Sequence, residues 1–274
     1  RRMRRLAHQN PLDASPVNSV TDNTATLPRT TPGRVELKGP LGLACPIMIA
    51  QLATTAMGFV DAVMAGRVSP RDLAAVALGN SIWIPVYLLM TGVLLATTPK
   101  VAQRFGAQQH DEIAPLVRQA LWLALLVGLL GSALLLSAEP ILHWMKVDPQ
   151  LIAPSMGYLQ GIAFGFPGIA FYYVLRCYSD GMGRTRPSMI IGVCGLLLNI
   201  PLNYALIYGH FGLPALGGVG CGWASGIVMW FMALSMAGWT RWSALYARTR
   251  ALLRLDRPQW PPLQRLITSA SPLA

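Results

Sequence analysis

The sequence predicts an all-α membrane protein, a bundle of six transmembrane helices. Hydrophobic residues make up 53% of the chain and charged residues only 12%. Six apolar runs are each long enough to cross a bilayer, which takes about 20 mostly apolar residues. The charged residues lie almost entirely between these runs. One water-soluble globule cannot bury so much apolar surface, so we expect the chain to fold in a membrane.

The first three expected spans are residues 40–66, 73–98 and 119–138. The first is followed by Arg67, and the second ends before Pro99 and Lys100. The third follows Arg118 and consists mainly of Leu and Ala. Each run is therefore bounded by residues that suit a membrane surface or a loop.

The last three expected spans are residues 156–175, 189–208 and 217–239. The sixth begins with several glycines and continues to Ala224 and Ser225, small residues that favour close packing of helices. Trp residues lie mostly near span ends, where we interpret them as interfacial anchors. These are Trp83, Trp144, Trp223, Trp239 and Trp242.

Prolines lie within four of the six spans: Pro46 in the first, Pro85 in the second, Pro167 in the fourth and Pro201 in the fifth. A proline inside a helix removes one backbone hydrogen bond and favours a bend. Membrane helices tolerate such breaks when neighbouring groups satisfy the backbone. We therefore expect these four residues to act as helix hinges.

The distribution of Lys and Arg predicts the topology. With the N-terminus in the cytoplasm, 19 of the 22 basic residues fall on the cytoplasmic side, and only Arg67, Arg71 and Lys146 lie outside. An even number of spans returns the C-terminus to the cytoplasm. We expect residues 1–39 to be a disordered basic cytoplasmic segment and residues 241–274 to be a second basic cytoplasmic segment, with no secretory signal peptide.

Several functional classes are disfavoured. The net charge of +11 is distributed between apolar runs, so we expect no nucleic-acid partner. The four cysteines lie in or beside apolar runs without metal-ligand spacing, and the four histidines are scattered in connecting segments. No nucleotide-binding, hydrolase or zinc-protease motif is present. We therefore expect neither an enzyme nor a bound cofactor.

Asp61 is the only acidic residue within the six expected spans. An acidic side chain at mid-membrane costs about 2.5 to 3.5 kcal/mol, so such a residue usually has a function. Gln51, Thr54 and Gly58 precede it by ten, seven and three positions, and we interpret the four residues as a polar stripe that lines a substrate cleft. The alternative is that Asp61 lies at the outer end of its span and reaches water.

Asn199 and Asn203 lie one helical turn apart in the fifth span and share a face. Amide oxygens can bind a hard cation or a polar substrate without adding another charge. The two asparagines could instead hold helices together as an interhelical clamp, and both interpretations can hold at once.

Five segments together resemble the multidrug and toxic compound extrusion (MATE) transporters over roughly residues 35–265, and most of all their bacterial multidrug-exporter branch. The segments are GFVDAVMAG at 58–66, VAQRFGA at 101–107, GMGRTRPSM at 181–189, NIPLNYALIYG at 199–209 and GGVGCGWAS at 217–225. The resemblance implies one six-helix lobe of a twelve-helix transporter in the bacterial inner membrane. It also implies export of cationic or amphipathic drugs and dyes in exchange for protons or sodium ions.

Asp61, Asn199, Asn203 and Ser225 resemble the family's cation-coupling residues in the amino-terminal lobe, so the only metal that we expect is sodium at this site. The partners implied are cationic drugs, membrane lipid and either a missing C-terminal lobe or a second copy of the chain. Two alternatives stay open. One is a lipid-linked oligosaccharide flippase of the same superfamily, which would need basic residues in the cleft. The other is a membrane fragment that does not transport.

Overall fold

A computed structural model describes residues 38–210, 212, 214–243 and 246, and these residues form eight α-helices and no strand. The helices are α1 (Lys38–Val68), α2 (Pro70–Leu95), α3 (Thr97–Gly106), α4 (His110–Leu136), α5 (Glu139–Trp144), α6 (Pro149–Gly181), α7 (Arg186–Tyr208) and α8 (Gly218–Trp242). The predicted segments 1–39 and 241–274 lie mostly outside the described residues, so their disorder and their side of the membrane stay predictions.

Within the described part of the chain, six spans are long and apolar enough to cross a membrane, which confirms the predicted fold class. α2 and α3 form a single span from Pro70 to Gly106, with Ala96 between them. The helices extend beyond the expected spans: α4 begins at His110 and α6 begins at Pro149. Because polar residues at a helix end do not stop the helix, a charge-free run marks the apolar part of a helix and not its full length.

Because the helices are longer than the expected spans, they contain acidic residues other than Asp61. Asp72 lies in the first turn of α2 and Asp180 lies in the last turn of α6, so Asp61 is not the only acidic residue within a spanning helix. The Ser69 hydroxyl caps α2 by accepting a hydrogen bond from the Asp72 backbone N–H at 3.0 Å. Asp72 Oδ1 accepts from the Gly218 N–H at 2.7 Å, which joins the first turns of α2 and α8.

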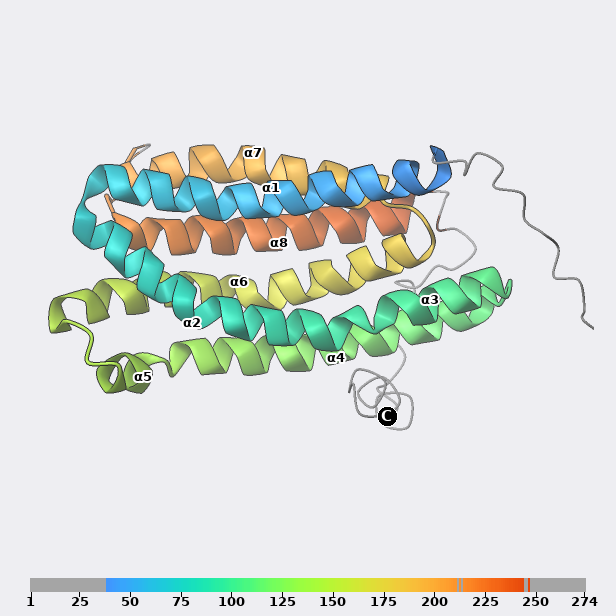
Figure 1. The fold of residues 1–274 in the computed structure, drawn as a ribbon, viewed down its shortest axis with the longest axis horizontal. Coiled ribbons are helices and arrows are strands. Elements are labelled where there is room, and N and C mark those ends of the chain that lie inside the picture. Colours follow the sequence, from blue (N-terminus) through green and yellow to red (C-terminus); the bar gives the residue numbers. More distant parts are fainter. Residues whose placement is uncertain (1–37, 211, 213, 244–245, 247–274) are drawn as a thin grey trace, which may run out of the picture. The chain divides into compact units, whose positions relative to one another are not determined.

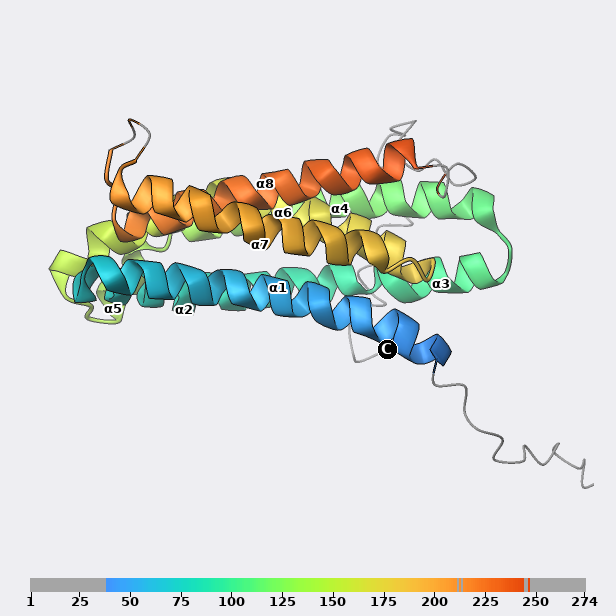
Figure 2. The same ribbon diagram turned by 90° about the horizontal axis from the view of Figure 1, so that it is seen from above.

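α6 is the central helix of the bundle. In its most apolar window 72% of the residues are buried, more than in the other five spans. α6 packs against α8, α4 and α2, whereas α1 packs mainly against α7 and α2 (Figures 1 and 2). This arrangement leaves α1, α2, α6 and α8 around one interior region, and that region contains the candidate site.

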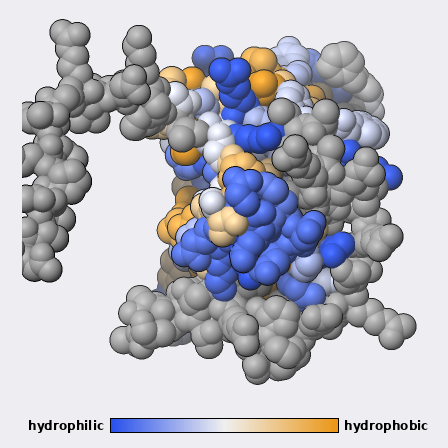
Figure 3. Space-filling view, turned by 90° about the vertical axis from the view of Figure 1, so that its right-hand side faces the viewer, coloured by the Kyte–Doolittle hydropathy of each residue, from blue (hydrophilic) through white to orange (hydrophobic). Residues whose placement is uncertain are grey.

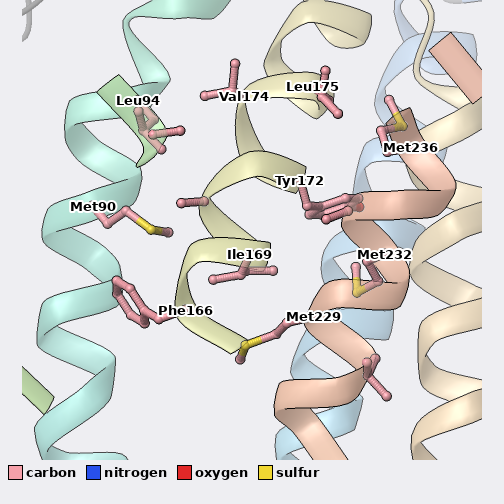
Figure 4. Close-up of a cluster of buried hydrophobic side chains, with 14 of the residues drawn as sticks. Met90, Leu94, Phe166, Ile169, Tyr172, Val174, Leu175, Met229, Met232 and Met236 are labelled. Atoms are coloured by element: carbon pink, nitrogen blue, oxygen red, sulfur yellow. The ribbon is translucent and has the colours of Figure 1, made fainter. Parts of the chain in front are cut away.

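The core on either side of α6 is built from long flexible and aromatic side chains (Figure 4). On one side Met90 of α2 lies beside Phe166, and Leu94 of α2 lies toward Val174. Met229 and Met232 of α8 approach from the other side. Methionine fills irregular gaps between helices because its unbranched chain has several rotatable bonds.

Glycines allow α6 and α8 to approach closely. A Cβ atom built on Gly222 would lie 2.2 Å from the Tyr158 carbonyl oxygen, and one on Gly226 would lie 2.3 Å from the Gly161 carbonyl oxygen. A Cβ on Gly165 would lie 2.5 Å from the Gly226 Cα. The close packing predicted for the sixth span is therefore confirmed. The matching glycine row of α6 was not predicted.

The four predicted hinge prolines lie inside helices that continue through them. Pro167 cannot donate to the Ala163 carbonyl, and the Ser132 hydroxyl of α4 donates to that oxygen instead, at 2.7 Å. Pro154 likewise leaves the Gln150 carbonyl, which accepts from Arg71 Nη2 at 2.6 Å. Neighbouring helices thus satisfy the backbone at both prolines, while a hinge role for Pro46, Pro85, Pro167 and Pro201 stays a prediction.

The end of the bundle with the turns between α3 and α4 and between α6 and α7 is hydrophilic (Figure 3). Its polar residues include Gln108, Asp111 and Glu112, all exposed. Arg104 Nε pairs with Glu112 Oε2 at 3.1 Å across the α3–α4 turn. This is the end that the distribution of Lys and Arg assigns to the cytoplasm.

Candidate functional site

Asp61 is buried in the middle of the bundle, with 4% of its surface exposed. Its carboxylate accepts two hydrogen bonds from other helices: Asn203 Nδ2 of α7 donates to Oδ1 at 2.5 Å and Ser225 Oγ of α8 donates to Oδ2 at 2.8 Å. The described residues provide no ion pair to Asp61. The alternative interpretation, in which Asp61 reaches water at the end of its span, is therefore wrong.

The two asparagines form the α7 side of the site. Asn203 Nδ2 also donates to Asn199 Oδ1 at 2.9 Å, one helical turn away. Asn199 Nδ2 and Asn203 Oδ1 are buried and have no hydrogen-bond partner among the described residues. Buried polar atoms are normally satisfied, so these two atoms can bind a water molecule, an ion or a substrate group.

Small residues bring the three helices together at this point. Gly220 of α8 packs closely on α7, where a Cβ atom would lie 2.8 Å from the Leu206 carbonyl carbon. Cys221 of α8 is buried, and its Sγ lies 3.5 Å from the Asp61 carbonyl oxygen. Because these side chains are small, an amide from α7 and a hydroxyl from α8 can both reach the carboxylate of α1.

A cavity of about 100 Å³ adjoins Asp61. It lies between α1, α2, α6 and α8 and has no Lys, Arg or His in its lining. The lining residues are Thr54, Met57, Gly58, Asp61, Asn80, Trp83, Tyr87, Tyr158, Ile162, Ile169, Ser225, Val228, Met229 and Met232. One carboxylate surrounded by aromatic rings and thioethers suits the charged group of an organic cation, since aromatic faces attract positive charge and methionine adapts to different shapes.

The structure groups most of the predicted residues at one place. Thr54, Gly58, Asp61 and Ser225 line the cavity. Asn199 and Asn203 contact Asp61 directly or through one another, outside the cavity lining.

Gln51 is the exception, because it is exposed and does not line the cavity. At 3.6 residues per turn, a separation of ten positions rotates Gln51 about 80° away from Asp61, whereas seven positions rotate Thr54 only about 20°. The predicted cleft role of Gln51 is therefore not supported by its position.

Ten of the lining residues were not predicted, and four of these are polar or aromatic: Asn80, Trp83, Tyr87 and Tyr158. Asn80 Oδ1 accepts a hydrogen bond from Trp83 Nε1 at 2.7 Å and from the Tyr158 hydroxyl at 2.8 Å. The interpretation of Trp83 as an interfacial anchor is wrong, since its indole faces this cavity. Asn80 could have been identified as a candidate from the sequence, because it is an amide inside an apolar span.

Replacing Asn80 by alanine is expected to lower the free energy of unfolding by about 1–3 kcal/mol, because the indole N–H and the phenol O–H would lose their shared acceptor. Thermal unfolding of the purified protein in detergent measures this change. The neighbouring Ser81→Ala is the matched control, since its exposed hydroxyl bonds only to the Leu78 carbonyl of its own helix. Equal melting temperatures for the two variants would contradict the role given to Asn80.

Comparison with known proteins identifies the family. The sequence profile of the MatE family matches residues 46–205. Multidrug resistance protein PmpM of Pseudomonas aeruginosa is 67% identical over 229 residues, which are 83% of this chain and 47% of that protein. Multidrug resistance protein MdtK of Klebsiella pneumoniae is 46% identical over 241 residues, which are 88% of this chain and 53% of that protein. The chain thus spans about half the length of these curated relatives.

Solved structures show the same fold. A crystal structure of a MATE protein in the bent conformation aligns with a TM-score of 0.76 at 23% identity, over 85% of this chain and 51% of that chain. The eukaryotic MATE transporter AtDTX14 aligns with a TM-score of 0.75 at 17% identity, over 85% of this chain and 50% of that chain. The six-helix arrangement described above therefore matches about half of each structure.

Proposed function

We propose, since this chain belongs to the MATE family of membrane transporters, that it is one lobe of a cation-coupled multidrug exporter. In this proposal Asp61 exchanges a proton or a sodium ion for a cationic or amphipathic drug in the adjoining cavity. The relatives from Pseudomonas aeruginosa and Klebsiella pneumoniae are both named multidrug resistance proteins. We infer a bacterial inner-membrane location and a transport function without catalysis.

The observation that carries the proposal is the environment of the Asp61 carboxylate. It is buried, its hydrogen-bond donors are neutral, and no basic side chain pairs with it among the described residues. A buried unpaired charge is costly in an apolar interior. Binding of a proton, a sodium ion or an organic cation removes that cost, so these ligands compete for one carboxylate.

Competition for one carboxylate, combined with alternating access of the site to the two sides of the membrane, is sufficient for antiport. When the coupling cation occupies Asp61, the electrostatic attraction that holds a cationic drug is lost and the drug leaves. When the drug binds, it displaces the coupling cation. By linkage, each ligand lowers the affinity for the other by the same factor.

The flippase alternative is less well supported. A lipid-linked oligosaccharide carries a pyrophosphate, for which arginine or lysine is the expected partner. The cavity lining contains neither and instead presents a carboxylate, which would repel the pyrophosphate.

A complete transport pathway needs a second lobe, which we propose to be either a C-terminal half or a second copy of this chain. In both arrangements the Asp61 cavity faces a partner across a central cleft. The exposed Gly58 and the half-buried Thr54 of α1 form part of the cavity lining and are the residues that a substrate from the cleft would meet first.

A chimera tests the proposal. Residues 38–243 of this chain would replace the matching half of the Pseudomonas relative, to which this chain is 67% identical. The chimera and the parent would be reconstituted in liposomes that contain a fluorescent cationic dye. We expect an imposed proton or sodium gradient to drive dye efflux by the chimera, and the gradient that works identifies the coupling ion. A correctly inserted chimera without gradient-driven efflux would contradict the proposal and is the result expected of a non-transporting fragment.

A further inference from the structure

A second and larger cavity lies on another side of the bundle, away from Asp61. It has a volume of about 290 Å³, near the lower limit of about 300 Å³ for pockets that bind small molecules. α4 and α8 both pack on α6 (Figure 2). The residues that line the cavity come from these three helices, so it forms a groove between α4 and α8. Its lining residues are Arg118, Leu121, Trp122, Leu125, Phe171, Leu175, Trp230, Ala233, Leu234 and Ala237.

The groove is apolar along its length and opens onto a lipid-like surface. Leu234 of α8 is 66% exposed, and the neighbouring Leu126 and Leu129 of α4 are also exposed. Leu126 and Leu129 follow Trp122 and Leu125 by one helical turn each, so they continue the same face of α4. Leucines exposed on a spanning helix are expected to contact hydrocarbon chains.

Basic residues mark one end of the groove. Arg118 is the only charged residue in its lining, and it lies at the hydrophilic end of the bundle described above. On α8, Leu234, Ala237 and Arg241 are spaced by three and four positions, which places Arg241 on the same helix face, one turn beyond Ala237. The two walls of the groove therefore each end in an arginine.

The depth of these arginines matches the phospholipid headgroups. Trp239 and Trp242 flank Arg241, and both are exposed at the end of α8. Tryptophan is enriched at the membrane–water interface, at the level of the headgroups. This end is also the one that the sequence assigns to the cytoplasm, where anionic lipids attract basic side chains.

We propose that the groove between α4 and α8 is a binding site for an anionic phospholipid. An acyl chain lies along Trp122, Phe171 and Trp230, and the lipid phosphate binds Arg118 and Arg241. The site is separate from the Asp61 cavity, so the proposal does not depend on the transport function.

A second copy of this chain fits the groove less well than a lipid does. Two copies inserted in the same orientation would be related by an axis along the membrane normal, so equal depths of each copy would meet. Arg118 and Arg241 of one copy would then face the same arginines of the other. A phosphate instead has the charge opposite to that of the two arginines.

Native mass spectrometry of the purified chain in detergent, titrated with phosphatidylglycerol or phosphatidylcholine, tests the site. We expect preferential binding of phosphatidylglycerol. Arg118→Gln and Arg241→Gln should each weaken it about fivefold, the effect of one basic residue at an anionic lipid surface. Arg186→Gln is the matched control, because Arg186 is exposed at the same end but begins α7, and it should leave binding unchanged. Ala237→Phe fills the groove and should weaken the binding of both lipids.

Three results would overturn the proposal. The first is equal binding of the two lipids by the unmodified chain, which would leave the arginines without a role. The second is unchanged phosphatidylglycerol binding in both arginine variants. The third is efficient disulfide cross-linking of two chains through Leu234→Cys in membranes, with the exposed Cys45 and Cys194 replaced by serine, which would assign the groove to a second copy.

Discussion

Replacing Asp61 by asparagine is expected to abolish the dependence of dye efflux on the ion gradient. The new amide can accept from Asn203 Nδ2 through its oxygen and donate to the Ser225 hydroxyl through its nitrogen, so the local packing is preserved, but it has no charge to bind a proton or a cation. We therefore expect an imposed gradient to drive dye loss no faster than in the same liposomes without a gradient, measured as the initial rate of dye loss.

Asp72→Asn is the matched control for that variant. Asp72 is the same residue type, but it lies in the first turn of α2 and accepts from Ser69 and Gly218, outside the cavity lining. We expect this variant to lose some thermal stability while its gradient-driven efflux persists. If Asp61→Asn and Asp72→Asn reduced efflux equally, a specific role for Asp61 in coupling would be excluded.

Replacing Gly222 by alanine is expected to cause the largest loss of stability of any single methyl addition discussed here. The new Cβ would lie 2.2 Å from the Tyr158 carbonyl oxygen and 2.9 Å from its carbonyl carbon. These are backbone atoms, so the contact cannot be relieved by a rotamer change, and α6 and α8 must move apart. Overpacking of this kind costs about 1–3 kcal/mol or more, and the melting temperature in detergent should fall by several degrees.

Gly92→Ala provides the same chemical change without a clash. Gly92 lies in α2, is exposed and has no atom within 4 Å of a built Cβ. We expect it to leave the melting temperature unchanged or to raise it slightly, since alanine favours a helix over glycine. A Gly222→Ala protein as stable as the Gly92→Ala protein would show that α6 and α8 do not pack as described.

The fold class could be predicted because a spanning helix depends on local composition. Each apolar run is sufficient by itself to indicate a span, and all six predicted spans correspond to helices. The hydrogen bonds of Asp61 with Asn203 and Ser225 join residues that were predicted from the sequence, because polar groups inside apolar spans tend to form hydrogen bonds with one another. The lengths of the helices were underestimated, since turns that contain charged residues continue a helix beyond its apolar part.

The contacts that could not be predicted from the sequence depend on how the helices are aligned with one another. Gly161 and Gly165 of α6 pack closely against α8 only because α8 places its own glycines opposite them. The sequence of one helix does not reveal that alignment. Trp83 lies well inside its run, and its position in the sequence does not show that it lines the cavity, where its indole donates to the Asn80 oxygen that also accepts from Tyr158. The position of Gln51 does not support its predicted cleft role for a simpler reason, since its angular position on α1 differs from that of Asp61.

The most direct test of the central claim is binding of a fluorescent cationic dye to the purified chain as a function of pH and sodium concentration. If drug and coupling ion compete for Asp61, dye affinity should fall as protons or sodium ions are added, and Asp61→Asn should bind the dye weakly and without this dependence. The account would be contradicted if the unmodified chain and the Asp61→Asn variant bound the dye with the same affinity and responded equally to protons and sodium ions.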